Sequence, residues 1–421
     1  MDCVIVGGGV AGLKAGLTIR QQSPEKSVIL VDTEKEIGYY RTLLPQFMNQ
    51  TLPEKKLFFW SIKDDSQLKV ISGVRVDSVD RRNRCLYLDN RQTINYQRLL
   101  IATGGRPIVP AVCEQAFCSG IYPVRSLATA RAARDWLPEH PEIVILGGGL
   151  VGVKMAAHLA GFNFSVTLIE REEHLLPQAL SAEAAQIVEA HLESNNIRLL
   201  LGSTVEDIGT ADKTIRAVQV DKKWIPCQTL FIAVGSIPDL NLFKDSALLQ
   251  DGQLVVTPTL QTKDTHIFGA GDAVTIVRNG NFTPWTWPQA VVQGQLAARN
   301  LLASASVSLD SLSRVNCMNL NGLSLAILGS PIPGAQRRQY SRPDSNVYRE
   351  LFHRDGKIVG GALIGDISNG GSLHTLMNIG GSSEADLDEV LRPCLEIFST
   401  GSSSCTKFRR RATLTLSGGV Y

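Results

Sequence analysis

Two short glycine-rich segments carry the residues of this chain that are best suited to bind a nucleotide. Residues 4–12 read VIVGGGVAG and residues 144–152 read VILGGGLVG, so the pattern recurs after 140 residues. The glycines of the pattern are Gly7, Gly9 and Gly12 in the first copy and Gly147, Gly149 and Gly152 in the second. They permit a tight turn, let the backbone approach a pyrophosphate and let a helix pack closely on a sheet.

Each copy belongs to a longer pattern of strand, turn, helix, strand and acid. An apolar run precedes the glycines, a small-residue helix follows, and a second apolar run ends in Asp32 or in Glu170. The helix N-terminus attracts phosphates, and the acid accepts hydrogen bonds from ribose hydroxyls. Two complete patterns predict two dinucleotides and electron transfer between them. Glu170 would repel a 2′-phosphate and so favours NADH over NADPH, although the adjacent Arg171 weakens this inference.

These patterns place the glycines and acids in an α/β protein with two Rossmann-like dinucleotide-binding domains, each a three-layer parallel sheet. A small C-terminal α+β domain with an antiparallel sheet follows, because runs such as KIVGGALIG alternate with turns such as Arg354-Asp355-Gly356-Lys357. A helix is expected from about Pro288 to Leu302. The expected divisions are 1–110 and 239–305 for the first domain, 111–238 for the inserted second domain, 306–395 for the C-terminal interface domain and 396–421 for a basic, mobile tail.

Composition limits the class of protein. The 421 residues are 44% hydrophobic and 19% charged, with a formal net charge of +2, which indicates no general attraction to nucleic acid. No apolar run reaches the roughly 18 residues of a transmembrane helix. The first strand begins near Asp2 and leaves no room for a signal peptide, so we expect a cytoplasmic protein. The basic tail would either dock an acidic partner or anionic lipid, or be a solvated terminus.

The eight cysteines form no CxxC pair and no metal-ligand grouping, so no metal site is expected. Cys113 and Cys118 are the closest pair, either as reduced thiols or as a redox pair. No cysteine lies between Asp32 and Cys85, where a redox-active cysteine near a flavin would be sought. The sequence therefore predicts an enzyme that works without a redox-active cysteine pair.

The order of the motifs resembles the FAD- and NAD-dependent pyridine nucleotide oxidoreductases over roughly residues 1–395. It is most similar to NADH:rubredoxin reductases and to the flavin module of NADH-dependent nitrite reductases. The motifs that carry the resemblance are VGGGVAG, Asp32, YYRTLLP (39–45), ATGG (102–105), GGGLVG, AVGSIP (233–238), GAGD (269–272), WPQAVVQGQLAARN (287–300) and DGKIVGGALIGD (355–366).

The resemblance implies that FAD binds the first domain and NAD(H) the inserted one. The implied FAD residues are Gly7, Gly9, Gly12, Asp32, Arg41, Thr103, Gly104, Gly271 and Asp272. The implied NAD residues are Gly147, Gly149, Gly152, Glu170 and Gly235. Asp32 would hold the FAD ribose, Arg41 would lie against the flavin and Asp272 would bind the ribityl and phosphate region. The alternatives are a surface salt bridge for Arg41 and a turn or helix cap for Asp272.

Two positions depart from the family pattern. Relatives carry Glu two residues after the third glycine of the NAD copy, where this chain has Lys154. Ferredoxin-reductase-like relatives carry Lys after the segment that matches residues 39–45, where this chain has Gln46. Our hypothesis is that Lys154 lies near the flavin–nicotinamide contact and tunes flavin potential or nicotinamide docking, with a partner that offsets its burial. The alternative is a lysine that extends to solvent.

The function implied is an FAD-dependent oxidoreductase that takes hydride from NADH and passes electrons to a redox protein or to a partner subunit's Fe–S or other metal centre. The C-terminal domain would make a homodimer or a hetero-complex. Trp285 and Trp287 would shield the flavin, line the electron exit or serve as core aromatics. The alternatives are an NADH oxidase that uses O₂, and a non-catalytic or weakly catalytic flavin-carrying subunit of a larger redox complex, which Lys154 favours. A membrane-surface quinone reductase needs a docking helix, and LFFW (57–60) is too short for one.

Overall fold

The computed structural model describes most of the chain up to residue 379. The described residues are 1–61, 68–116, 118–160, 162, 164–243, 248–278, 281–282, 285–302, 307–309, 315–329, 331–332, 334–342, 347–379 and 391. The described residues form two compact units. The first unit comprises Met1–Gly147, Phe162–Ser165 and Val205–Leu312, and the second comprises Gly148–Gly161, Val166–Thr204 and the described residues of Ser313–Tyr421. The expected basic tail lies outside the described residues.

A five-stranded parallel sheet forms the centre of the first unit, in the order β19-β7-β1-β2-β3. Its strands are β1 (Cys3–Val6), β2 (Val28–Asp32), β3 (Lys69–Ser72), β7 (Arg98–Ile101) and β19 (Ile267–Gly269). All four residues of β1 are buried, as expected for a central strand covered on both faces. The parallel register brings the carboxyl ends of β1 and β2 to the same edge, where the first glycine turn and Asp32 lie.

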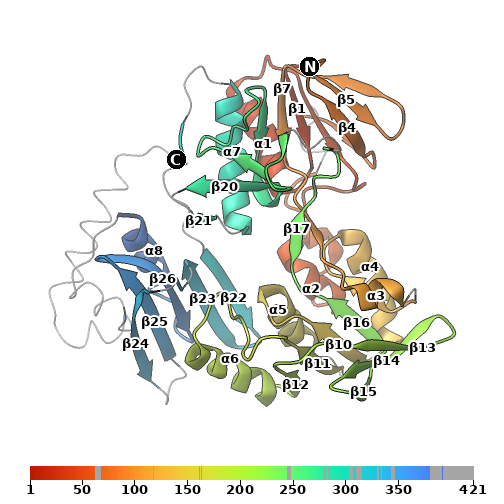
Figure 1. The fold of residues 1–421 in the computed structure, drawn as a ribbon, viewed down its shortest axis with the longest axis vertical. Coiled ribbons are helices and arrows are strands. Elements are labelled where there is room, and N and C mark those ends of the chain that lie inside the picture. Colours follow the sequence, from red (N-terminus) through yellow and green to blue (C-terminus); the bar gives the residue numbers. More distant parts are fainter. Residues whose placement is uncertain are drawn as a thin grey trace. The chain divides into compact units, whose positions relative to one another are not determined.

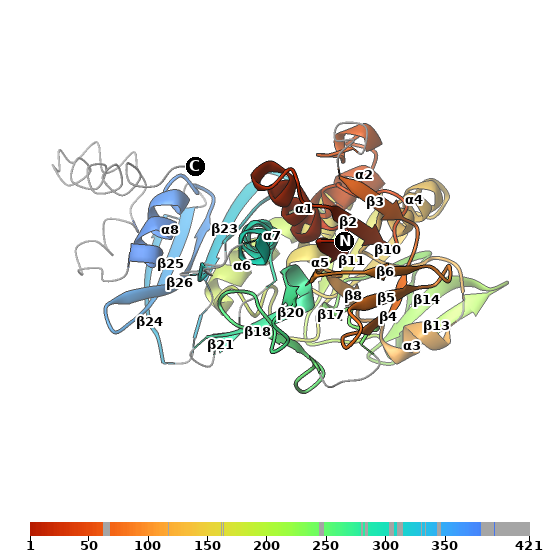
Figure 2. The same ribbon diagram turned by 90° about the horizontal axis from the view of Figure 1, so that it is seen from above.

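Two helices pack closely together in the first unit, α1 (Val10–Gln22) and α7 (Trp287–Leu302). Figures 1 and 2 both show them side by side. Small residues permit this approach, because a Cβ added to Gly294 would lie 2.2 Å from the carbonyl oxygen of Ala11. The observed α7 begins one residue before the predicted start at Pro288 and ends at the predicted Leu302.

The remaining elements of the first unit are short. They include η1 (Arg41–Leu43), α2 (Leu44–Met48), η2 (Glu54–Lys56), β4 (Val76–Asp80), β5 (Cys85–Leu88), β6 (Thr93–Asn95), β18 (Leu254–Val256), η5 (Gly271–Ala273), β20 (Val274–Arg278) and β21 (Asn281–Phe282). The others are β8 (Gly105–Pro107), α3 (Ala111–Gln115), β9 (Ile121–Pro123), α4 (Leu127–Trp136), η3 (Leu137–Glu139), β10 (Glu142–Leu146), β13 (Asp207–Ala211), β14 (Thr214–Val220), β15 (Lys223–Pro226), β16 (Thr229–Ile232) and β17 (Ser236–Pro238). Strand β16 pairs in parallel with β10 and with β9.

The second unit joins the helix of the second glycine turn to the C-terminal sheet. Its elements are α5 (Leu150–Leu159), β11 (Ser165–Ile169), α6 (Ala182–Ser194), β12 (Ile197–Leu200), β22 (Val315–Leu320), β23 (Leu323–Gly329), β24 (Gln336–Arg342), β25 (Val347–Arg354), β26 (Lys357–Ile364) and α8 (Gly370–Ile379). Strands β11 and β12 pair in parallel. Within this unit, α5 contacts β22 and α6 contacts β25.

The C-terminal sheet is antiparallel throughout, in the order β22-β23-β26-β25-β24. Asp355 and Gly356 both have positive φ in the tight turn between β25 and β26, as the Asp-Gly pair predicts. Parallel sheets with a separate antiparallel sheet confirm the fold class expected from the sequence. Among the described helices, none combines the length and the apolar character needed to cross a membrane.

The contact between α1 and α7 predicts the effect of a single methyl group. Gly294→Ala should force the helices apart and lower stability by about 1–3 kcal/mol, measured as a lower melting temperature. Gly371→Ala in α8 is the matched control, because nothing lies within 4 Å of an added Cβ there. Equal melting temperatures for the two variants would contradict this account of the packing.

Candidate functional site

The first glycine turn connects β1 to α1. Gly7 has φ of +109°, and a Cβ there would lie 2.1 Å from the carbonyl oxygen of Ala102. Gly9 is the N-cap of α1 and, like any glycine, has no side chain with which to cap the helix. Gly12 is buried in the first turn of the helix. The N–H groups at this helix end are therefore suited to bind an anionic group.

The carboxylate of Asp32 holds this turn from the end of β2. The Gly8 N–H donates to its Oδ2, and the Glu34 N–H donates to its Oδ1 at 2.6 Å. Burial raises the pKa of Asp32, against the effect of these two hydrogen bonds. A pocket in the first unit is lined by Gly8, Gly9, Asp32, Glu34, Glu36, Ile37, Gly38, Tyr39 and Arg41. The acid and the free helix end therefore lie in one hollow.

The second glycine turn repeats this arrangement with other residues. Gly147 has φ of +110°, and a Cβ there would lie 2.6 Å from the carbonyl oxygen of Ala233. The Gly148 N–H donates to Oε2 of Glu170 at 2.5 Å, and the Glu172 N–H donates to its Oε1 at 2.9 Å. Gly149 is the N-cap of α5, and Gly152 is buried within that helix. The same two backbone positions bind the acid in both copies.

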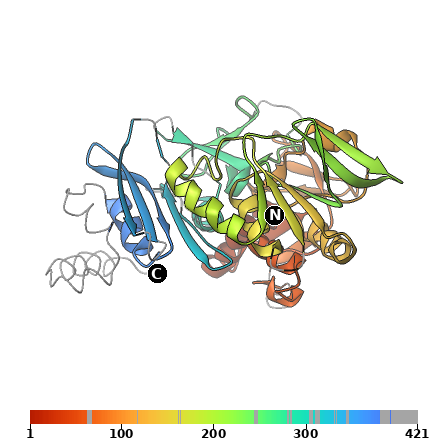
Figure 3. The same cartoon turned by 90° about the horizontal axis from the view of Figure 1, so that it is seen from below.

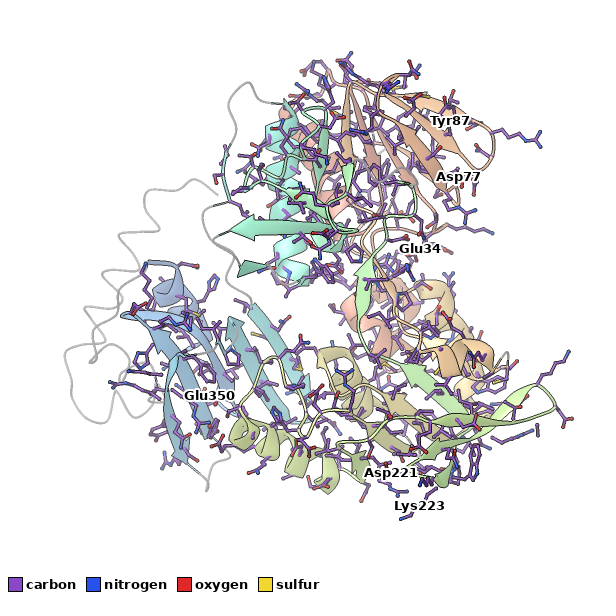
Figure 4. All side chains as sticks on the ribbon, in the orientation of Figure 1. Glu34, Asp77, Tyr87, Asp221, Lys223 and Glu350 are labelled. Atoms are coloured by element: carbon purple, nitrogen blue, oxygen red, sulfur yellow. The ribbon has the colours of Figure 1, made fainter. Side chains whose placement is uncertain are left out.

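Arg41 lies in a network of polar side chains rather than on an open surface. Its Nη2 is 2.5 Å from Oε1 of Glu34, and its Nη1 donates to the carbonyl oxygen of Arg125 at 2.8 Å. The Tyr39 hydroxyl donates to Oε2 of Glu34 at 2.6 Å and accepts from the Leu127 N–H at 3.1 Å. Figure 4 labels Glu34, which joins the two side chains. The network links residues 34–41 to the segment that follows β9.

Asp272 faces a cation that the sequence analysis missed. Its Oδ2 accepts from Nη2 of Arg125 at 2.9 Å, and both side chains are partly buried. The preceding Gly271 N–H donates to Oε1 of Gln293, a buried residue of α7, at 2.7 Å. The only sequence signal for Arg125 was its place just after an apolar strand, before the N-cap Ser126.

Thr103, Gly104 and Gly235 lie where the chain crosses between the two dinucleotide folds. Strands β8 and β17 pair antiparallel at this crossing. The Thr103 hydroxyl donates to the carbonyl oxygen of Asp239 at 2.6 Å, and the Asp239 N–H donates to that of Gly104 at 2.9 Å. The carbonyl oxygen of Gly235 accepts from the Ile108 N–H at 3.0 Å. The repeated small residues therefore mark a paired crossing.

Two buried polar side chains at the start of α7 fit a polar ligand. Neither the amide oxygen nor the amide nitrogen of Gln289, which is 3% exposed, has a hydrogen-bond partner in the described part of the chain. The buried hydroxyl of Thr286 likewise has no hydrogen-bond partner among the described residues. Buried polar atoms normally have partners, and a flavin pyrimidine offers both donors and acceptors. The residues present therefore fit FAD.

The aromatic residues near α7 have different surroundings. The ring of Trp287 lies 5.5 Å from that of Tyr40 and 5.7 Å from that of Phe59, measured between centroids. Trp285 is more exposed, and its indole N–H donates to the carbonyl oxygen of Val274 at 3.0 Å. Trp287 is thus a packing residue of a cluster.

Lys154 is a partly buried residue of α5. Burial lowers the pKa of Lys154. Burial, and then the charge of Lys154, lower the pKa of His158, one helical turn further along. Lys14 stands at the same place in the first copy, where its amine lies 5.9 Å from the centroid of the Phe59 ring. Among the described residues, no group of three or more His, Cys, Asp or Glu side chains is arranged to hold a metal ion.

The two acids predict separable effects on cofactor binding. Asp32→Ala leaves two buried N–H groups without their acceptor, a cost of about 1–3 kcal/mol each, so we expect purified protein to lose most of its FAD. The measurement is the ratio of flavin to protein absorbance. Glu170→Ala is the matched control from the second copy and should retain FAD. Equal FAD loss in both variants would contradict the assignment.

Comparison with known proteins gives the family. The sequence profile described as "Pyridine nucleotide-disulphide oxidoreductase" matches residues 1–294. The "NADH oxidase" of Methanocaldococcus jannaschii is 25% identical over 394 residues, covering 87% of this chain and 88% of that protein. The "Rubredoxin-NAD(+) reductase" of Pseudomonas putida is 26% identical over 317 residues, covering 73% and 81%.

Among solved structures, the covalent putidaredoxin reductase–putidaredoxin complex has a chain that superposes with a TM-score of 0.85. It shares 19% identity, and the match covers 93% of this chain and 98% of that chain. FAD and NAD(H), the cofactors expected from the sequence, are those of this family. The chain belongs to the pyridine nucleotide-disulphide oxidoreductase family.

Proposed function

We propose that this chain takes hydride from NADH onto FAD and passes the electrons to a small redox protein or to the metal centre of a partner subunit. The observation that carries the proposal is the pair of glycine turns, in which Asp32 and Glu170 accept from the same two backbone positions. Two equivalent turns support two dinucleotides in one chain. The chain is a pyridine nucleotide-dependent oxidoreductase by its family.

The residues of the chain bind and orient the two cofactors. Asp32 and Glu170 each offer a carboxylate to a ribose, and the helix ends at Gly9 and Gly149 favour the phosphates. FAD, when bound, supplies the centre that accepts hydride from NADH. Hydride transfer needs no acid or base from the protein, so proximity and orientation are its main contributions. Glu170 favours NADH because a carboxylate repels a 2′-phosphate.

The absence of cysteine between Glu34 and Arg84 and the burial of Cys113 and Cys227 support an acceptor other than a disulfide. Burial raises the pKa of Cys113 to about 11 and that of Cys227 to about 12. Since the thiolate is the reactive form, such buried thiols are poor nucleophiles at neutral pH. The reductase relative from Pseudomonas putida, named for rubredoxin, supports a redox protein as the acceptor.

A second candidate is an NADH oxidase that uses O₂. The observation in its favour is the Methanocaldococcus jannaschii relative, which carries the name NADH oxidase and matches 87% of this chain. The two functions share the same cofactor sites and differ only in the acceptor. Turnover of NADH with and without an added acceptor therefore distinguishes the two functions, whereas cofactor binding does not.

The proposal predicts NADH turnover that depends on an added acceptor. FAD-loaded protein should reduce a rubredoxin or ferredoxin, followed by absorbance without oxygen, faster with NADH than with NADPH by roughly tenfold or more. In air without an acceptor, NADH consumption should stay below about one turnover per second. Rapid aerobic turnover without an acceptor would instead establish the oxidase, and faster reaction with NADPH would contradict the role given to Glu170.

Lys154 carries a separate prediction. If Lys154 stabilises charge at the flavin–nicotinamide contact, Lys154→Met should slow hydride transfer by roughly tenfold, equal to about 1.4 kcal/mol, and lower the flavin potential. Lys223→Met removes an exposed lysine and is the control (Figure 4). Unchanged flavin potential and hydride-transfer rate in Lys154→Met would exclude this role.

A further inference from the structure

One carboxylate of the C-terminal sheet is fully buried. Glu350 lies on β25 and is 0% exposed, with Gln339 of β24 and Ala362 of β26 as its register partners. Figure 4 labels it on that sheet. A carboxylate in such a place is costly unless hydrogen bonds or opposite charges compensate it. The identity of its partners therefore indicates what it does.

The partners of Glu350 belong mainly to the start of α6. The Ser181 N–H donates to its Oε1 at 3.1 Å, and the Ser181 hydroxyl donates to its Oε2 at 2.6 Å. The Tyr348 hydroxyl also donates to Oε2, at 3.3 Å, and Nη1 of Arg337 lies 4.0 Å from it. Ser181 is the N-cap of α6, and its Oγ accepts from the Ala184 N–H at 3.2 Å. Glu350 thus binds the positive end of a 13-residue helix.

Helix α6 is held by the C-terminal sheet at its other end as well. Nε2 of His191 lies 2.6 Å from the carbonyl oxygen of Leu320, at the end of β22. At the first turn, the guanidinium of Arg337 makes two hydrogen bonds of 2.6 and 2.9 Å with the exposed carboxylate of Glu183. Figure 3 shows the helix beside the strands of this sheet. The C-terminal sheet therefore holds α6 at both of its ends.

Helix α6 also supports the second glycine turn, through residues 175–176, which precede the helix. Oε1 of Glu189, on α6, accepts from the Leu175 N–H at 2.8 Å. The next N–H, that of Leu176, donates to the carbonyl oxygen of Gly148 at 3.0 Å. Leu176 has φ of +54°, which is strained for a leucine and is maintained by these contacts and by its burial. The Gly148 N–H is the group that donates to Glu170.

We infer that Glu350 is a positioning residue for the NADH site. This inference rests on the proposed function. The buried carboxylate holds the start of α6, and α6 holds residues 175–176 against the Gly148 carbonyl. The C-terminal sheet thereby keeps the second turn in the shape that accepts a pyrophosphate. The FAD turn contains none of these residues, so the effect is confined to the pyridine nucleotide.

The test compares three substitutions in the FAD-loaded full-length protein. Glu350→Gln keeps the size of the side chain and removes its charge, and Ser181→Ala removes the hydroxyl from the other side. Both should raise the half-saturating NADH concentration for anaerobic flavin reduction, and the dissociation constant of NAD⁺, on the order of tenfold. The limiting rate of flavin reduction and the FAD content should be unchanged. Ser181→Thr restores a hydroxyl and should restore nucleotide affinity.

Glu193→Gln is the matched control on the same helix. It removes an exposed carboxylate of α6 and leaves the contact between Glu350 and Ser181, so NADH affinity should stay within about twofold of the unmodified protein. Unchanged NADH affinity in both Glu350→Gln and Ser181→Ala would overturn the inference. The inference would also be overturned if NADH affinity fell only in variants that lose FAD or melt at a lower temperature, because Glu350 would then contribute only to stability. Failure of the unmodified protein to bind NADH would overturn the proposed function itself.

Discussion

A single carboxylate contact closes each of the two glycine turns of this protein. Asp32 accepts from the N–H of Gly8, and Glu170 accepts from the N–H of Gly148. Each acid also accepts from the backbone N–H two residues further along the chain. The contact joins two parallel strands at their carboxyl ends and aims the helix N-terminus into the same space. A carboxylate so placed closes the turn and still presents acceptor lone pairs to a ribose. Under the proposed function, fold and cofactor binding depend on the same atoms.

The two copies differ in what supports them. Around the first, Glu34, Tyr39, Arg41 and Arg125 form a polar network within the first unit. Around the second, the support comes from α6 and, through Glu350, from the C-terminal sheet of the second unit. Such a sheet can influence nucleotide affinity without contacting a nucleotide, because a helix transmits its position along its length.

Local patterns were predictable from the sequence, and long-range partners were not. The Asp355-Gly356 turn depends on adjacent residues, and each glycine turn is followed by its acid 22 or 24 residues after the second glycine of the GGG run, so local pattern and spacing reveal them. The pairs Arg125–Asp272 and Ser181–Glu350 join residues 147 and 169 positions apart, and nothing in the spacing relates them. Lys154 was recognisable only as an unusual residue at a known place. Its partial burial depends on packing that only the structure gives.

The most direct test of the account is to mix the FAD-loaded protein, without oxygen and without an acceptor, with one equivalent of NADH. Two functional dinucleotide sites in one chain predict that the flavin absorbance is lost and that NAD⁺ appears in equal amount. Retained flavin absorbance, in protein shown to bind both FAD and NADH, would contradict electron transfer between the two sites.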